Sequence, residues 1–122
     1  MVFDQLKLSS WNHKKKLFLT SKPITMIIVQ ETFICKPGNA SKLAKLFKEV
    51  MADTPEVINI LTDMTGEFNR VVMQSKYENL TAYEGFFKKY MEDTEEMKKM
   101  KEKMKGYHEM YISGTREIFQ VW

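Results

Sequence analysis

The chain has few of the residues that build disulfides, metal sites or membrane anchors. It contains one cysteine, Cys35, and two histidines, His13 and His108, among 122 residues. A single cysteine cannot form an internal disulfide, and these three side chains do not have metal-ligand spacing. No apolar run approaches the ~18 residues that cross a bilayer. We therefore expect no metal, no other cofactor, no membrane segment and a location in the reducing cytoplasm.

The chain also lacks the features of a nucleic-acid-binding protein. Its formal net charge is only +3, with 29% charged residues, whereas nucleic-acid footprints need a clustered basic excess. RNA-recognition modules further need a run of glycine and aromatic residues on the third strand. The segment FNRVVMQSKYE contains Phe68 but no such run. We expect no nucleic-acid partner, and we interpret the lysine run 98–105 as a solvated helix face.

Hydrophobic material is sufficient for one core and too little for two. The chain is 43% hydrophobic, and its length fits a single domain. Residues 1–25 follow neither the strand period nor the helix period, so they are interpreted as an N-terminal extension or arm. Residues 26–122 are regularly patterned and form the predicted domain.

The hydrophobic period switches between two and about 3.6 along the domain. The segment IIVQETFICK (27–36) alternates and is rich in β-branched residues, which predicts a strand. After Pro37 and Gly38, Asn39 is a candidate cap for a helix that runs to Met51 with one apolar stripe. Further strands are predicted over 56–65, 68–77 and 111–122, with a hairpin turn at Gly66.

A second helical region lies between the last two strands. Thr81 and Glu84 have the spacing of a capping box, and Asp93 with Thr94 indicates a kink or restart. Helically spaced methionines follow, and we interpret them as core or dimer packing: Met97, Met100 and Met104. The order β-α-β-β-α-β predicts an α+β ferredoxin-like fold, a four-stranded antiparallel sheet with both helices on one face.

The other face of the sheet is then open. The face assigned to the helices carries Ile58, Ile60, Met64, Val71, Met73, Ile112 and Ile118. The open face is left with Val29, Phe33, Val57, Leu61, Phe68, Val72, Tyr111, Phe119 and Val121. So much exposed apolar surface indicates a partner, and a homodimer that packs sheet against sheet would cover it.

Polar residues on that open face are candidate ligand-binding groups. They are Glu31, Arg70, Gln74 and Glu117, beside Phe33. Polar groups in an apolar cavity orient ligands or transfer protons, and Arg70 is expected to pair with Glu31 or Glu117. The alternative is an interface network that fixes the register of the dimer. Asp63 is expected in solvent at a strand end, and Cys35 as a small core residue.

Three segments resemble a known superfamily. VQETFICKPGNASKLAKLF, RVVMQSKYENLTAYEGFF and SGTREIFQVW look like elements of the dimeric α+β barrel proteins, and are most similar to NIPSNAP-like and antibiotic-biosynthesis-monooxygenase-like members. The resemblance implies a barrel of two sheets that binds a small, largely apolar or aromatic molecule. Some members of the superfamily oxidise such molecules without a metal or flavin, so the resemblance also implies a monooxygenase-like activity. The alternative is a non-enzymatic dimerisation or stress-response module.

The chain lacks most of the residues that characterise the haem-degrading branch of this superfamily. That branch uses an Asn on the first strand, a Trp on the third and a His on the second helix. Here the first strand offers Gln30 and Glu31, the third has no Trp, and only His108 could correspond to the histidine. No catalytic set is identified.

Overall fold

The computed structural model describes residues 26–122, so the arm predicted for residues 1–25 lies outside the described residues. The elements are β1 (Ile27–Cys35), α2 (Ala40–Val50), β2 (Val57–Thr62), β3 (Arg70–Tyr77), α3 (Leu80–Tyr90), α4 (Glu95–Lys103), the 3₁₀ turn η1 (Tyr107–Glu109) and β4 (Tyr111–Gln120). The predicted restart of the second helical region is confirmed, because α4 begins at Glu95, directly after its N-cap Thr94, whose Oγ1 accepts a hydrogen bond from the Met97 N–H at 3.2 Å.

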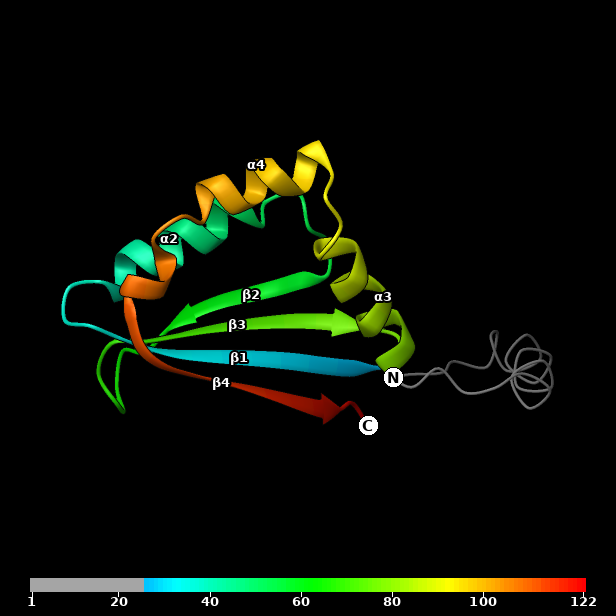
Figure 1. Ribbon diagram of the computed structural model, residues 1–122. Coiled ribbons are helices and arrows are strands. Elements are labelled where there is room, and N and C mark those ends of the chain that lie inside the picture. Colours follow the sequence, from blue (N-terminus) through cyan, green and yellow to red (C-terminus); the bar gives the residue numbers. More distant parts are fainter. Residues whose placement is uncertain (1–25) are drawn as a thin grey trace, which may run out of the picture.

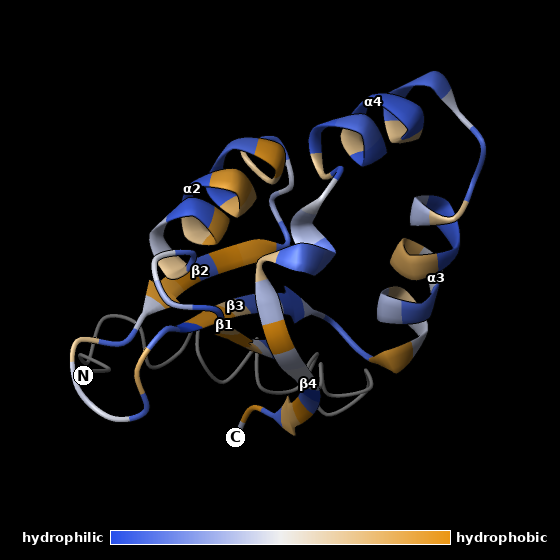
Figure 2. Cartoon of the chain, turned by 60° about the vertical axis from the view of Figure 1, so that its left-hand side comes forward, coloured by the Kyte–Doolittle hydropathy of each residue, from blue (hydrophilic) through white to orange (hydrophobic). Residues whose placement is uncertain are grey.

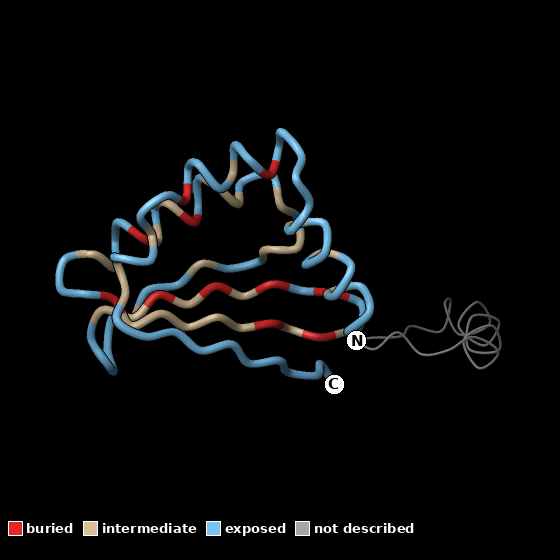
Figure 3. Tube along the Cα trace, viewed as in Figure 1, coloured by how far each residue is buried: buried red, intermediate tan, exposed pale blue. Residues whose placement is uncertain are grey.

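The strands form one antiparallel sheet in the order β2-β3-β1-β4. In Figure 1, α2 and α4 lie next to each other over the sheet, and α3 stands over its other end. The predicted ferredoxin-like α+β fold is confirmed. Burial follows this layering, since the central strands β1 and β3 carry buried positions while β4 is mostly exposed (Figure 3).

The strand register corrects the predicted faces of the sheet. Val29 lies opposite Ser75 and Phe33 opposite Val71, and residues directly paired across a ladder share a face. That face is the buried one, so Val29 and Phe33 point toward the helices and not to the open side. The covered face of β1 carries the charged Glu31 and the open face carries Ile28 and Ile34, so alternation alone did not reveal which face is covered.

The β2 strand and the loop after it depart from the prediction for a second reason. The pairing of β2 shifts register between Val57 and Asn59, so Val57 faces the helices while Ile58 is exposed. Met64 and Phe68 lie in the loop between β2 and β3 and are exposed. Neither belongs to a face of the sheet.

The main core lies between α2, the two central strands and the end of α4. Its buried members are Cys35, Leu43, Phe47, Val71, Met73 and Met104. Leu43 and Phe47 are four residues apart on α2, which puts them on the same side of the helix. Figure 2 shows the same polarity, with apolar residues of α2 turned toward the strands. The prediction that Cys35 is a small core residue is confirmed, and burial raises the pKa of its thiol.

Two predicted helix caps are wrong. The α3 helix is capped by Asn79, whose Oδ1 accepts from the Ala82 N–H at 2.8 Å, and not by Thr81. Asn39 precedes α2 but makes no capping hydrogen bond with its side chain. Its backbone is in the helical region, whereas a capping residue normally has extended dihedral angles.

Candidate functional site

A cavity of about 250 Å³ lies between the sheet and the helices. From the strands it is lined by Val29, Glu31, Phe33, Val57, Met73, Ser75, Tyr77 and Arg116. From α2, α3, α4 and η1 it is lined by Phe47, Met51, Tyr83, Phe86, Phe87, Tyr90, Met100, Met104 and Tyr107. Most of the wall is aromatic rings and methionine side chains, so the site favours an apolar or aromatic occupant.

The cavity exists because α3 stands off the sheet. None of the residues of α3 is buried, whereas α2 buries Leu43 and Phe47. The α3 helix is held to the sheet through Tyr77, whose ring lies 5.1 Å from that of Tyr83 and 5.6 Å from that of Phe86. Aromatic contacts at these distances are attractive, yet they leave the space on the α4 side of α3 unfilled. The α3 helix therefore forms one wall of the cavity and contacts the sheet through aromatic side chains.

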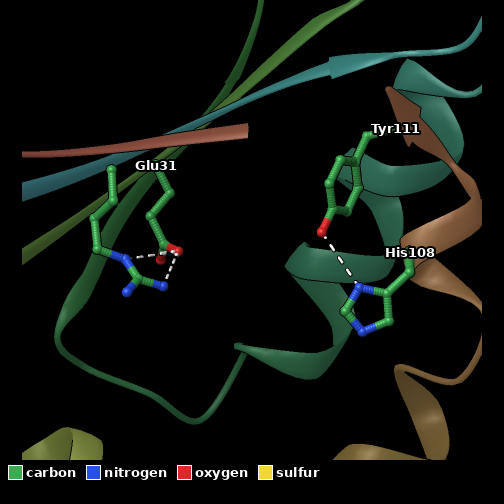
Figure 4. Close-up of polar contacts among 4 residues, drawn as sticks. Glu31, His108 and Tyr111 are labelled. Carbon is green, nitrogen blue, oxygen red and sulfur yellow. Dashed lines mark hydrogen bonds and ion pairs between the residues drawn. The ribbon is translucent and has the colours of Figure 1, made fainter. Parts of the chain in front are cut away.

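One ion pair stands among these apolar groups. Arg116 on β4 donates from Nη2 to Glu31 Oε2 at 2.9 Å and from Nε to the same oxygen at 3.3 Å (Figure 4). The guanidinium also lies 5.6 Å from the centre of the Phe87 ring. Glu31 and Arg116 are directly opposite in the ladder between β1 and β4, so the pairing of these strands positions both groups. The hydrogen bond to Glu31 raises the pKa of Arg116, which keeps the guanidinium charged.

Tyrosine hydroxyls and the buried Ser75 hydroxyl supply the other polar groups of the wall. Burial raises the pKa of Tyr77 to about 12 and also raises the pKa of Tyr107. Both side chains are therefore neutral at physiological pH and keep their O–H donors. Together with Arg116 they make the cavity richer in hydrogen-bond donors than in charged acceptors.

The predicted ligand-binding residues separate onto two faces of the sheet. Glu31 and Phe33 line the cavity on the helix side. Arg70, Gln74 and Glu117 lie on the open side, because their register partners Ile34 and Gln30 are the alternate residues of β1. The five residues therefore do not form one site.

The ion pair predicted for Arg70 is also wrong. Its Nε lies 3.5 Å from Asp63 Oδ2, and its backbone N–H donates to Asp63 Oδ1 at 3.1 Å. Asp63 is not in solvent, since only 11% of its side chain is exposed. The loop that joins β2 to β3 brings these two residues together, while Glu31 pairs with Arg116 on the other side of the sheet.

The open face carries a row of polar side chains between apolar ones. Asn59 Nδ2 donates to Gln74 Oε1 at 3.0 Å, and Gln74 Nε2 donates to Gln30 Oε1 at 2.9 Å. Glu117 lies opposite Gln30 and extends the row across the sheet. We call these four residues, three amides and one carboxylate, the amide row. Apolar side chains flank it, with Leu61 and Val72 on one side and Ile28 and Phe119 on the other.

Several cavity residues escaped the sequence analysis. Arg116 was missed because its partner Glu31 lies 85 positions earlier in the chain, and only the strand register joins them. Tyr83, Phe87 and Tyr90 recur at helical spacing and form an apolar stripe, but this spacing gives no sign that the stripe faces a cavity instead of a filled core. A cluster of hydroxyl-bearing aromatics on such a stripe was the one available signal.

The remaining candidates lie away from the cavity. His108 is an exposed residue of η1, and its Nδ1 lies 3.3 Å from the Tyr111 hydroxyl (Figure 4). Within residues 26–122 no three histidine, cysteine or acidic side chains are grouped closely enough to hold a metal ion. In the same part of the chain, no helix has the length and apolar character needed to cross a membrane.

Solved structures with the same fold include several bacterial proteins. A NIPSNAP family protein from Agrobacterium tumefaciens superposes with a TM-score of 0.65 at 17% identity, over 77% of this chain and 90% of that chain. A protein from Bacteroides fragilis, described as dimeric and ferredoxin-like with unknown function, gives 0.53 at 15% identity over 79% and 96%. A candidate antibiotic biosynthesis monooxygenase from Chloroflexus aurantiacus gives 0.53 at 8% identity over 79% and 90%.

These neighbours confirm the predicted resemblance to NIPSNAP-like and monooxygenase-like proteins. At these identities the likeness is one of fold. No protein-family model matches the chain, and no curated protein matches it.

Proposed function

We propose that the protein binds a small, largely apolar molecule in the cavity between its sheet and its helices. The observation that carries this proposal is the wall itself, which combines aromatic and methionine side chains with a single ion pair, Glu31 with Arg116. Binding sites for small molecules are typically apolar clefts with a few polar groups that orient the ligand. The proposed ligand site is therefore on the helix side of the sheet, opposite the open face on which the sequence analysis predicted it.

The volume of the cavity limits the size of the ligand. An apolar cavity of about 150 Å³ is sufficient for benzene. At about 250 Å³ the cavity accommodates one substituted ring or two fused rings. The Chloroflexus neighbour supports a monooxygenase-like reaction on such a molecule, and this reaction is the enzymatic form of the proposal.

The methionines of the chain allow a direct test of the binding site. Met73, Met100 and Met104 line the cavity, whereas Met64 is 98% exposed and Met91 is 63% exposed. In protein labelled with ¹³C at the methionine methyl groups, naphthalene derivatives should shift the signals of the first three. Met64 and Met91 are internal controls and should not move. Shifts confined to the controls, or no saturable shift at all, would contradict a ligand site in this cavity.

A second proposed property is a homodimer formed through the open face of the sheet. It is supported by the amide row and its apolar flanks, which are a typical composition for an interface core with a polar row that fixes register. The Bacteroides neighbour is described as dimeric. Two such faces would bury on the order of 1,500 Å², which is in the range of stable interfaces.

Val72 is the residue to change in a test of the dimer, because it lies between Leu61 and Thr32 on the open face. Val72→Asp would bury an unpaired carboxylate in the interface, at a cost of several kcal/mol, about enough to dissociate the dimer. Ser41→Asp, on the exposed side of α2, adds the same charge elsewhere and should leave the dimer intact. Light scattering after size exclusion reads the mass. Unmodified protein that runs as a 14.5 kDa monomer at micromolar concentration would refute the dimer.

The two properties also separate the ligand-binding function from its alternative. A module that only dimerises needs the open face but not the cavity. Saturable binding in the cavity of unmodified protein would favour the ligand-binding function, and a dimer whose cavity binds no probe would favour the non-enzymatic module.

A further inference from the structure

The guanidinium of Arg116 has donors to spare at the rim of the cavity. A guanidinium carries five N–H groups, and those directed at Glu31 come from Nε and Nη2 and end on one oxygen, Oε2. Within residues 26–122 no other acceptor contacts this side chain. Arg116 has 47% of its side chain exposed against 23% for Glu31, so the arginine is the outer member of the pair.

We propose that the ligand of this cavity is an aromatic carboxylate, with its ring among the aromatic side chains and its carboxylate on Arg116. This inference rests on the proposed ligand-binding function and adds the chemical class of the ligand. The free edge of a guanidinium matches the two oxygens of a carboxylate, because two parallel N–H groups donate to them at once. Arg116 then bridges two carboxylates, that of Glu31 on one edge and that of the ligand on the other.

Phe87 and Glu31 hold the guanidinium of Arg116 in place before a ligand binds. The centre of the Phe87 ring lies 5.6 Å from the Arg116 guanidinium carbon, within cation–π distance, and this contact restricts the rotation of the Arg116 side chain. Glu31 holds it from the side of β1. An arginine held in this way loses little side-chain freedom when the ligand binds, and a preorganised donor binds more tightly than a mobile one.

The charged residues around the cavity favour one orientation of an anionic ligand. On the side away from β4, the cavity adjoins a groove between α3, α4 and the loop before β2, and the two share Phe86, Tyr90 and Met100. That groove carries the acidic residues Asp53, Glu56 and Glu96 against one basic residue, Lys89. An anion is therefore repelled from the groove and attracted to the rim at Arg116.

The test compares three naphthalene derivatives of the same size by isothermal titration calorimetry. They are 2-naphthoate, the neutral 2-naphthylmethanol and the cationic 2-naphthylmethylammonium. We expect unmodified protein to bind 2-naphthoate at least about tenfold more tightly than the alcohol, and to bind the ammonium more weakly than either. A preference for the ammonium would assign the site to Glu31 and overturn the proposal.

Two variants with one matched control locate the effect. Arg116→Gln should remove the preference for 2-naphthoate while the affinity for the alcohol changes by less than about twofold. Arg70→Gln removes the same charge on the opposite face and should change neither affinity. Glu31→Gln removes the competing carboxylate, so it should tighten 2-naphthoate binding about fivefold.

The neutral probe distinguishes failure of this inference from failure of the proposed function. If 2-naphthylmethanol binds and 2-naphthoate binds no better, the cavity is a ligand site without selectivity for anions, and the inference is wrong. If none of the three probes binds unmodified protein, the ligand-binding function itself is refuted. Binding of the alcohol by Arg116→Gln also shows that this variant is folded.

Discussion

Tyr77 should make the stability of the protein depend on pH in the alkaline range. Its side chain on β3 is only 7% exposed and packs against the rings of Tyr83 and Phe86. Burial disfavours the phenolate and raises the pKa of Tyr77 from 10.0 to about 12. The perturbation is a rise in pH, and Tyr77→Phe, which cannot ionise, provides the comparison.

The direction and size of the effect follow from linkage. Between pH 10 and pH 12 the unfolded chain has lost the Tyr77 proton while the folded chain keeps it. The contribution of this group to stability is therefore complete below pH 10 and disappears as the pH rises to about 12. One pKa unit corresponds to 1.36 kcal/mol, so the loss reaches about 2 to 3 kcal/mol. Domains of this size are stable by only ~5–15 kcal/mol, so the change is readily measurable.

The assay is urea unfolding of both proteins at intervals from pH 8 to pH 12. Loss of the hydroxyl shifts the stability of Tyr77→Phe at every pH, so the slopes are compared and not the levels. Lysine, Cys35 and Tyr107 titrate in both proteins, and their effects cancel in the difference. The unmodified protein should lose stability more steeply above pH 10 than the variant. Parallel curves would show that Tyr77 ionises equally in the folded and unfolded states, and would refute the argument from burial.

Three further outcomes test the local structure around the cavity. Asn79→Ala should destabilise the protein by about 1 kcal/mol in urea unfolding, because it removes the cap of α3. Thr81→Ala should have less than half that effect, and equal losses of stability would contradict the assignment of the cap. Gly85→Ala should stabilise it by about 0.5–1 kcal/mol, since nothing lies within 4 Å of the added Cβ, and a lower urea midpoint would show that α3 needs the glycine. Added haemin should give no stoichiometric Soret complex because His108 is exposed on η1 outside the cavity, and a complex abolished by His108→Ala would disprove this.

The order and type of the elements are readable from the amino-acid sequence alone. A strand alternates with period two and a helix with period 3.6, and these periods belong to neighbouring residues, so they are readable without the rest of the fold. The strand predicted over 27–36 was found in this way and is observed over Ile27–Cys35. The restart at Asp93 and Thr94 and the buried place of Cys35 were predicted from the residue types themselves. The order of these elements leads to the ferredoxin-like sheet, because short connections allow few other arrangements.

Packing between elements fixes which face of each strand is covered and which residues meet in the cavity. Val29 and Phe33 share their face with the charged Glu31, while Ile28 and Ile34 lie on the other face, so the direction of the strand depends on which side the helices pack. A register shift in β2 turned Val57 inward. Glu31 and Arg116 are 85 residues apart and become neighbours through the pairing of β1 with β4. Periodicity reports on contacts within an element, whereas a ligand site of this kind is made of contacts between elements, and those depend on register and packing that no local pattern encodes.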